Sequence, residues 1–289
     1  MKKTADTRSR LEKIMDSAVR NNPHSSDIIK AFRPVLIEKN RLAGSLASGD
    51  GEALAMDEAK FREGVPLGDQ NSLFFTDDPW KTIALTLIPE LVKGFPALAP
   101  DLERLQGLIE AGTVSFDGSS GAMAQELASA HGIGEQAVLF LSHMAGRVIL
   151  EMRARDWGKL LQDFTWEKGY CPLCGGAPMI AKIREGQSAR ILHCSQCGHE
   201  WTFSRVICPS CGNTEQKTMS YFFVEDKAQE STFVCERCRH YLITADRVSD
   251  LIDFDADVCA LSLVHLDVIM QEKGYLPMAS CAWNTFSPE

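Results

Sequence analysis

The chain has no cysteine in its first 170 residues and no long hydrophobic run anywhere. Its most apolar stretches, 83–92 and 137–150, are short or interrupted by Pro89, His143 and Arg147. A membrane-spanning helix needs about 18–20 uninterrupted apolar residues. The first residues are polar and charged, without the apolar segment of a secretory signal. We therefore expect a cytoplasmic protein that does not insert into a membrane.

Positive charge is also scarce, because 39 acidic residues outnumber 30 lysines and arginines and give a formal net charge of −9. Proteins that bind nucleic acid through its phosphates usually carry a basic surface, so this balance disfavours such binding. Catalytic signatures are missing too: there is no glycine-rich phosphate loop, no His-Glu-x-x-His pair and no Gly-x-Ser-x-Gly motif. The sequence therefore favours a protein that is not an enzyme and that acts on another protein.

What the chain does have is a globular composition, with 45% hydrophobic and 24% charged residues over 289 positions. This length suggests two domains at roughly 150 residues each. Residues 1–165 carry apolar positions at helical spacing and predict six or seven helices. Asp78-Pro79 and Ser119-Ser120 are expected helix starts, and Pro34 and Pro89 are expected bends or breaks.

After about residue 166 the pattern changes to short, strand-like segments separated by glycine, proline, asparagine and aspartate. The expected strands cover 179–184, 189–193, 200–206, 219–224 and 231–234. A last helix is expected over 257–273, where Gly274 ends it.

Eight of the ten cysteines fall within the 68 residues from Cys171 to Cys238. They form four Cys-x-x-Cys pairs: Cys171/Cys174, Cys194/Cys197, Cys208/Cys211 and Cys235/Cys238. Two intervening residues let both thiolates of a pair bind one metal ion, and glycine after the second cysteine permits the left-handed turn that closes the pair. Glycine follows three pairs, but Arg239 follows the fourth, so we expect strain in that turn.

The spacing of the pairs favours two tetrathiolate sites. Nineteen residues separate the first two pairs and 23 the last two, enough for a β-hairpin or a three-stranded sheet in each interval. Because consecutive elements are usually neighbours, we expect Cys171, Cys174, Cys194 and Cys197 in one site and Cys208, Cys211, Cys235 and Cys238 in the other. Other groupings stay open, since the ten residues between the second and third pairs also suit a compact ribbon.

A closed shell of four thiolates leaves no open position for a substrate, so both metals are expected to be structural. Tetrahedral thiolate ligation suits zinc and iron equally, and only iron could change its oxidation state there. Thiol–disulfide catalysis fits four pairs at this spacing poorly.

The remaining cysteines and the histidines carry weaker signals. Cys259 and Cys281 stand outside the pairs, and Cys259, which lies among apolar residues, is expected to be a core thiol. His193, His199 and His240 flank paired cysteines, where a surface role is favoured over a hydrogen bond to a metal ligand.

The cysteine-rich region has little charge for binding nucleic acid. Residues 168–246 contain nine basic and eight acidic side chains, and two doubly negative tetrathiolate centres would bring this region to −3 and the chain to −13. Its aromatic side chains could stack on bases, but strand spacing around metal sites favours a place in the core. These aromatics are Trp201, Phe203, Tyr221, Phe222 and Phe223.

Taken in order, these motifs resemble the formate dehydrogenase accessory protein family, FdhE. The resemblance covers residues 170–275, and its specificity lies in the ordered set of motifs. The matching motifs are Tyr170-Cys-Pro-Leu-Cys-Gly-Gly-Ala-Pro178, Arg190-Ile-Leu-His-Cys-Ser-Gln-Cys197, Trp201, Arg205, Cys208-Pro-Ser-Cys-Gly212, Cys235-Glu-Arg-Cys238, Tyr241, Asp246, His265-Leu-Asp267 and Gln271-Glu-Lys-Gly-Tyr275. The helical half offers little to match, and Arg239 departs from the knuckle glycine.

The resemblance implies a cytoplasmic maturation factor with a helical domain followed by two rubredoxin-like metal modules. Proteins of this family are needed to obtain active molybdenum- or tungsten-dependent formate dehydrogenase, and they bind its catalytic subunit before export. The family is associated with iron, which the resemblance carries over to the eight paired cysteines. It is not known for enzymatic activity.

Together these features predict an α+β multidomain chain. An all-helical domain over 1–165 precedes rubredoxin-like or zinc-ribbon β modules over 166–206 and 207–248, and a helix with a tail over 249–289 packs on the modules. The alternatives to a maturation factor are a rubredoxin-like electron-transfer or redox-sensing protein and a zinc-ribbon nucleic-acid-binding protein, which the acidic charge disfavours.

Overall fold

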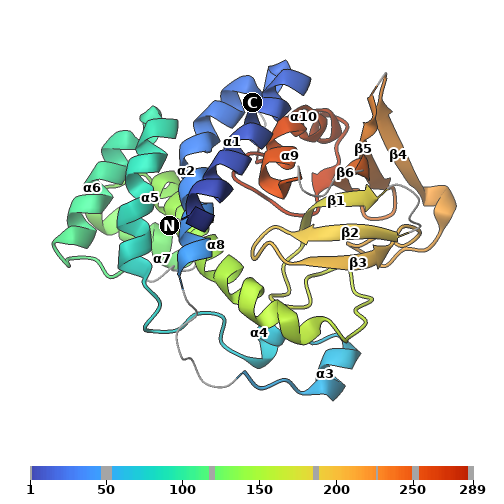
Figure 1. Cartoon of the computed structure of the whole chain (residues 1–289), viewed down its shortest axis with the longest axis horizontal. Helices are drawn as coiled ribbons and strands as arrows, with labels where there is room; N and C mark the ends of the chain where they lie inside the picture. Colours follow the sequence, from blue (N-terminus) through green and yellow to red (C-terminus); the bar gives the residue numbers. More distant parts are fainter. Residues whose placement is uncertain are drawn as a thin grey trace.

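A computed structural model describes residues 2–46, 54–116, 121–184, 189–225, 227–248 and 254–285. Helices gather on one side and a β-sheet on the other, and the long helix α8 (Glu135–Trp157) runs from the helical side toward the sheet (Figure 1). The predicted order of a helical region, a β region and C-terminal helices is confirmed.

The helical region contains two long helices at its start and a bundle around α8. Its further helices are α1 (Lys2–Asn21), α2 (Ser26–Ser45), α3 (Glu58–Glu63), α4 (Leu67–Gln70), α5 (Trp80–Gly94), α6 (Ala99–Glu110) and α7 (Gly121–His131). The start of α5 lies two residues after Asp78, and the start expected at Ser119-Ser120 lies outside the described residues.

Neither proline breaks its helix, because Pro34 lies inside α2 and Pro89 inside α5. A proline within a helix removes one backbone hydrogen bond. Each of these helices nevertheless buries its apolar face on both sides of the proline, with Leu36 following Pro34 and Leu87 and Leu91 flanking Pro89. Tertiary packing therefore outweighs the local cost.

The sheet consists of seven strands among the described residues. They are β1 (Pro178–Arg184), β2 (Ala189–Cys194), β3 (Glu200–Ser204), β4 (Met219–Val224), β5 (Lys227–Cys235), β6 (His240–Val248) and the short β7 (Leu276–Pro277). The five expected strands correspond to β1 to β5. The expectation omitted β6, whose residues 241–245 are all buried and therefore show no alternation of polar and apolar positions.

Two antiparallel units of three strands meet in the middle of this sheet. The strand order is β3-β2-β1-β6-β5-β4, and β7 pairs with β6. Only the central neighbours of this path, β1 and β6, run parallel, with Ile180 opposite Ile243 and Ala181 opposite Thr244. The two cysteine-bearing units thus share one continuous sheet.

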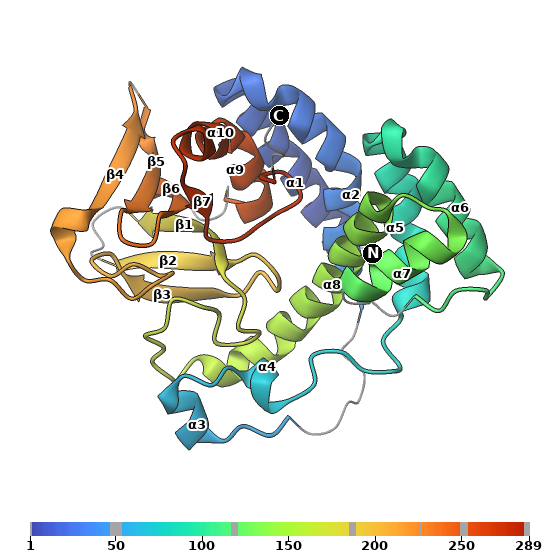
Figure 2. The same ribbon diagram turned by 180° about the vertical axis from the view of Figure 1, so that it is seen from behind.

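The expected C-terminal helix is split into α9 (Ala256–Ser262) and α10 (Val264–Glu272). The break lies at Leu263, whose N–H donates to Cys259 O at 3.1 Å and to Ala260 O at 3.2 Å. Gly274, with φ of 77°, follows α10 as expected. Both helices lie between the helical region and the sheet (Figures 1 and 2).

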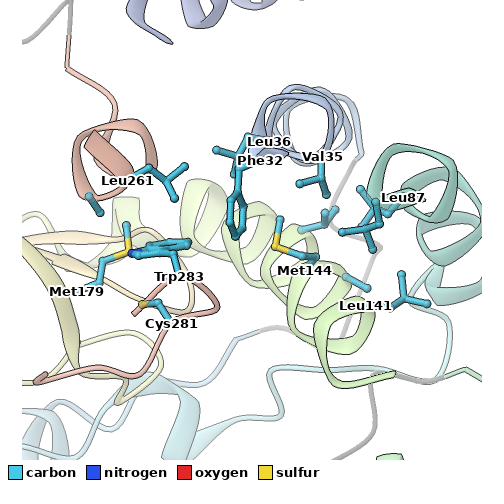
Figure 3. Packing of buried hydrophobic residues seen from close by; sticks show 14 of the residues in the cluster. Phe32, Val35, Leu36, Leu87, Leu141, Met144, Met179, Leu261, Cys281 and Trp283 are labelled. Carbon is cyan, nitrogen blue, oxygen red and sulfur yellow. The ribbon is translucent and has the colours of Figure 1, made fainter. Parts of the chain in front are cut away.

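One buried hydrophobic cluster joins the helices to the sheet and the C-terminal tail. Trp283 of the tail lies beside Met179 of β1, and Phe32 of α2 points toward it (Figure 3). The rings of Phe32 and Trp283 are 5.7 Å apart and perpendicular, a favourable aromatic geometry. The sheet is therefore held against the helices by apolar contacts.

Candidate metal centres

Each Cys-x-x-Cys pair is folded as a tight turn. The N–H of Gly175 donates to Cys171 O at 3.0 Å, and the N–H of Gly212 donates to Cys208 O at 2.9 Å. Gly175, Gly198 and Gly212 have φ between 68° and 73°, the left-handed conformation that glycine adopts at little cost. The glycines expected to close three of the turns therefore have the required conformation.

The first two pairs come together as cluster one, formed by Cys171, Cys174, Cys194 and Cys197, whose Sγ atoms lie within 4.8 Å of one another. The Sγ distances are 3.5 Å from Cys171 to Cys197 and 3.4 Å from Cys174 to Cys194. Three of the four cysteines are buried, and Cys174 is half-buried. Cluster one is thus largely shielded from solvent.

The last two pairs form cluster two, with Cys208, Cys211, Cys235 and Cys238 also within 4.8 Å. Cys208 Sγ lies 3.8 Å from Cys238 Sγ, and Cys211 Sγ lies 3.8 Å from Cys235 Sγ. Cys211 is exposed and Cys238 half-buried. Cluster two therefore faces solvent, and the consecutive grouping of the pairs is the one found.

Both clusters can hold a metal ion. Four sulfurs about 2.3 Å from a tetrahedral metal are separated by about 3.8 Å, close to the distances observed. A metal binds the ionised thiolate, so a lowered thiol pKa assists binding. Burial of Cys235 favours its neutral form, but the backbone N–H of Cys238 and the amide of Asn213 outweigh this effect and lower its pKa to about 7, whereas burial raises the pKa values of Cys208 and Cys238.

Cluster one is held between helical segments and the sheet. The N–H of Leu67 donates to Pro172 O at 3.0 Å, and the N–H of Gly68 donates to Leu173 O at 2.7 Å, so α4 binds the first turn directly. Gly158, at the end of α8, lies against His199, which follows the second cysteine turn. The contact is so close that a Cβ on Gly158 would lie only 3.1 Å from the His199 ring. The first cluster therefore needs the helical region for its surroundings.

Arg190 places a buried positive charge beside cluster two. Its guanidinium donates to Ile207 O at 2.5 Å and lies 4.6 Å from the centroid of the Phe233 ring. Burial lowers the Arg190 pKa, whereas Tyr221 and the Cys208 thiol oppose this shift. This cation can offset part of the negative charge of a tetrathiolate centre.

The strain expected at Arg239 is present: its φ is 60°, a left-handed conformation that is unfavourable for any residue with a Cβ. Its guanidinium lies 3.8 Å from the centroid of the Tyr275 ring and donates to Glu236 at 2.9 Å and to Lys273 O at 2.9 Å. These contacts tie the fourth turn to the segment after α10.

The cysteines outside the pairs agree with the expected core role. Cys281 is buried, and Cys259 packs against the hydrophobic core. Among the flanking histidines, His193 contacts Glu200 at 3.3 Å and His240 contacts Cys238 O at 2.8 Å. His199 is half-buried against Gly158.

The expectation that all five aromatics belong to the core is wrong for two of them. Trp201 and Phe203 are buried, whereas Phe222 and Phe223 are 38% and 56% exposed. Both lie on β4, which is an edge strand of the sheet. Successive side chains of a strand point to opposite faces, so this edge exposes aromatic surface on both of its faces.

A buried charge cluster beside cluster one was not foreseen from the sequence. Lys39 Nζ lies 2.7 Å from Asp257 Oδ2 and 2.5 Å from Glu151 Oε1, and Arg147 Nη1 lies 2.8 Å from Asp257 Oδ1. Burial disfavours the ionised Asp257 carboxyl, but Arg147 and Lys39 outweigh it and hold its pKa well below the usual value. Three distant helices supply these residues, and no local pattern marks such a contact.

Comparisons with known proteins agree with the ordered motifs. The family model "FdhE, central domain" matches residues 170–205. An FdhE homologue of Aquifex aeolicus is 32% identical over 38% of this chain, and the chain spans only 40% of that protein. An FdhE homologue of Shewanella oneidensis is 28% identical over 86% of this chain and 79% of its own length.

The fold is also similar to a solved structure. The crystal structure of the FdhE protein from Pseudomonas aeruginosa superposes with a TM-score of 0.62 at 22% identity, covering 95% of this chain and 94% of that one. Within the described residues, no helix has the length and apolar character needed to cross a membrane. The resemblance to the FdhE family is confirmed.

Proposed function

We propose, from the confirmed resemblance to the FdhE family, that this chain is an accessory protein for formate dehydrogenase. In this proposal it binds the catalytic subunit of a molybdenum- or tungsten-dependent enzyme in the cytoplasm, before export, and that enzyme needs it for activity. The observation that carries the proposal is the set of ordered cysteine motifs, which fold into two four-cysteine clusters and of which the family model matches the first two pairs, over 170–205.

The eight paired cysteines are proposed as the ligands of two metal ions, iron by family expectation or zinc. A bound ion would cross-link two turns in each cluster, and iron would add one-electron chemistry. Because four protein sulfurs complete a tetrahedral shell, neither cluster has a position for a substrate. This donor set supports an accessory role without enzymatic activity.

The surface favours a protein partner over nucleic acid. The chain has a formal charge of −9, which opposes binding to phosphates. Phe222 and Phe223 expose aromatic surface on the edge strand β4. Aromatic side chains are enriched in protein interfaces, and an open strand edge offers backbone groups for pairing.

A complementation experiment tests the requirement for this chain. A strain without its gene should lack formate dehydrogenase activity, and the wild-type chain should restore it. Cys171→Ser should fail to restore activity because it removes one sulfur of cluster one. Cys259→Ser makes the same atomic change outside both clusters and is the matched control. Full activity in the deletion strain would refute the proposal.

Binding is tested separately by purifying the tagged chain from cells that produce the immature catalytic subunit. Apolar contact with the subunit should survive a high-salt wash, which screens exposed charges. A complex that forms only with the mature enzyme, or no complex at all, would contradict a role before export.

A second candidate is a rubredoxin-like electron carrier or redox sensor, and the exposure of Cys211 in cluster two favours it. Electron exchange requires that the metal lie close to a partner or to solvent. Protein purified without oxygen should then contain iron and show thiolate-to-iron absorption that disappears on reduction. Protein that contains only zinc excludes this candidate.

A further inference from the structure

A groove of about 680 Å³ lies along β3, between this strand and the segment 158–167 that follows α8. The strand β3 is the last on its side of the sheet, and the chain after α8 runs beside it (Figure 1). All five residues of β3 line the groove, and no cysteine does. The groove therefore follows an open edge of the sheet and has no part in the two metal centres.

The backbone of β3 has groups free to pair on the side of the groove. Cys194 N–H donates to His199 O at 3.0 Å, so these two residues form a hydrogen-bonded pair in the ladder that joins β2 to β3. Hydrogen-bonded and non-hydrogen-bonded pairs alternate along antiparallel strands. Glu200 and Thr202 consequently direct their N–H and C=O groups away from β2. Within the described part of the chain, no other backbone group pairs with them.

The walls of the groove are mainly apolar. Phe164 and Ile207 line it and are half-buried. Trp166 and Trp201 are nearly buried and complete the wall, and their indole N–H groups already donate to backbone oxygen atoms. What these rings offer to the groove is therefore apolar surface. Clefts with such a lining bind apolar side chains.

The charge of the groove is negative. Its lining contains Glu167 and Glu200 but no lysine or arginine. Glu200 is paired with Lys182 at 2.6 Å, whereas Glu167 is exposed and forms no ion pair within the described residues. The aromatic rings of the wall also attract cations. An occupant with a lysine or arginine side chain is therefore favoured over an acidic one.

An open strand edge beside apolar walls is typical of a site for an extended peptide. Such a peptide joins the sheet as a further strand, in which the backbone supplies hydrogen bonds and alternate side chains occupy pockets. The five residues of β3 match a segment about 17 Å long. Backbone groups of a folded protein are already paired, so a segment can add to β3 only before the protein that contains it has folded.

We propose, on the basis of the function proposed above, that this groove binds an extended segment of the immature catalytic subunit. The segment combines apolar residues with at least one lysine or arginine and pairs with β3. Once the subunit folds, the backbone of this segment pairs within the subunit and is no longer available to β3. The groove thus distinguishes the immature subunit from the mature one.

An array of overlapping short peptides that cover the catalytic subunit tests the proposal, with the metal-loaded full-length chain as the ligand. Bound peptides should combine apolar residues with lysine or arginine, and proline at every second position should abolish their binding. No bound peptide, or mainly acidic ones, would overturn the proposal. If the immature subunit still co-purifies in that case, the proposed function stands. Bound peptides together with full activity in the deletion strain would instead refute the proposed function.

Variants of β3 locate the site, with the strongest peptide titrated in solution by fluorescence anisotropy. Thr202→Pro removes an N–H that faces away from β2 and should weaken binding about tenfold without disturbing the ladder. Thr202→Val keeps this N–H and is the matched control, which should bind the peptide like the wild-type chain. Glu167→Gln should weaken binding about threefold. Its control, Glu103→Gln on α6, makes the same change of charge elsewhere and should have no effect.

Circular dichroism and metal content show whether each variant keeps its fold. If folded Thr202→Pro binds the peptide as tightly as Thr202→Val, the site lies elsewhere and the proposal is wrong. If Thr202→Pro instead turns a dimer into a monomer and leaves peptide binding unchanged, a second copy of the chain occupies the groove, which also overturns the proposal. Should Thr202→Pro fail to fold, equal binding by Glu167→Gln and Glu103→Gln would have the same consequence.

Discussion

Clusters one and two have the same ligand set but different surroundings. Cluster one is enclosed by α4, the end of α8 and the first three strands, and three of its four cysteines are buried. Cluster two has an exposed Cys211 and is tied to the C-terminal segment through Arg239 and to the sheet through Arg190. The same Cys-x-x-Cys motif is therefore enclosed by the fold in cluster one and accessible to solvent in cluster two.

The largest expected effect is a difference in unfolding temperature between Cys171→Ser and Cys208→Ser. Structural metal binding contributes roughly 10–16 kcal/mol in small zinc peptides, comparable to the whole stability of a domain. We expect Cys171→Ser to lower the unfolding temperature far more, because cluster one supports the contacts of α4 and α8. Circular dichroism and metal content per chain measure both effects, with Cys259→Ser as control.

The same pair of variants also tests accessibility. A chelator should remove metal from the wild-type chain in two phases, and Cys208→Ser should lack the fast phase. Similar unfolding temperatures for both variants together with a single release rate would show that the two clusters do not differ in structural role or accessibility.

The second prediction concerns the charge cluster beside cluster one. Asp257→Asn leaves the buried Lys39 and Arg147 with less opposing charge and should cost about 3–5 kcal/mol of unfolding free energy. Glu12→Gln, in an exposed pair with Arg8, should cost less than about 1 kcal/mol. Urea unfolding at pH 7 measures both variants, and equal losses would contradict the importance of the buried cluster.

The pH dependence of Asp257 has a definite sign. Its folded pKa is held below the unfolded value, so its contribution is complete at pH above about 4 and is lost as the pH falls below that value. The wild-type unfolding free energy should therefore decrease more steeply in acid than that of Asp257→Asn.

For Asp267 on α10 the expected pH dependence is opposite. Burial raises the pKa of Asp267 to about 6, although the hydrogen bond from Tyr241 partly opposes this shift. Because the folded pKa exceeds the unfolded one, the contribution of Asp267 to stability is complete below about pH 4 and is lost as the pH rises to about 6. The decrease should be on the order of 2–3 kcal/mol at 1.36 kcal/mol per pKa unit. Unfolding titrations of Asp267→Asn should lack it.

The smallest expected effect belongs to Arg239→Gly. Glycine relieves the positive φ, worth about 1 kcal/mol, but the variant loses the contacts with Glu236, Lys273 and Tyr275. The net change in unfolding free energy should lie within about 1 kcal/mol, and the metal content should be unchanged. A loss of metal from cluster two would show instead that metal binding depends on the conformation of this turn, as in cluster one.

Local signals explain what the sequence could predict. The Cys-x-x-Cys pairs, their glycines and the first five strands are encoded within a few residues, and the structure has them where expected. The consecutive grouping followed from the spacing of the pairs.

The remaining features depend on contacts between distant parts of the chain. β6 is buried on both faces and lacks a periodic pattern, and α2 continues through Pro34 because its packing compensates for one hydrogen bond. Likewise, Lys39, Arg147 and Asp257 meet across more than 200 residues of sequence. Such features are visible only once the chain is folded.

The parallel pairing of β1 with β6 also determines the order in which the protein can be completed during synthesis. The strand β1 gains its second neighbour only after residue 240 has left the ribosome. Until then it presents an open edge, and such edges readily pair with other chains. The helices are synthesised earlier and share a buried cluster with Met179 and Ile180, so they can cover one face of β1 while the nascent chain awaits its last strands.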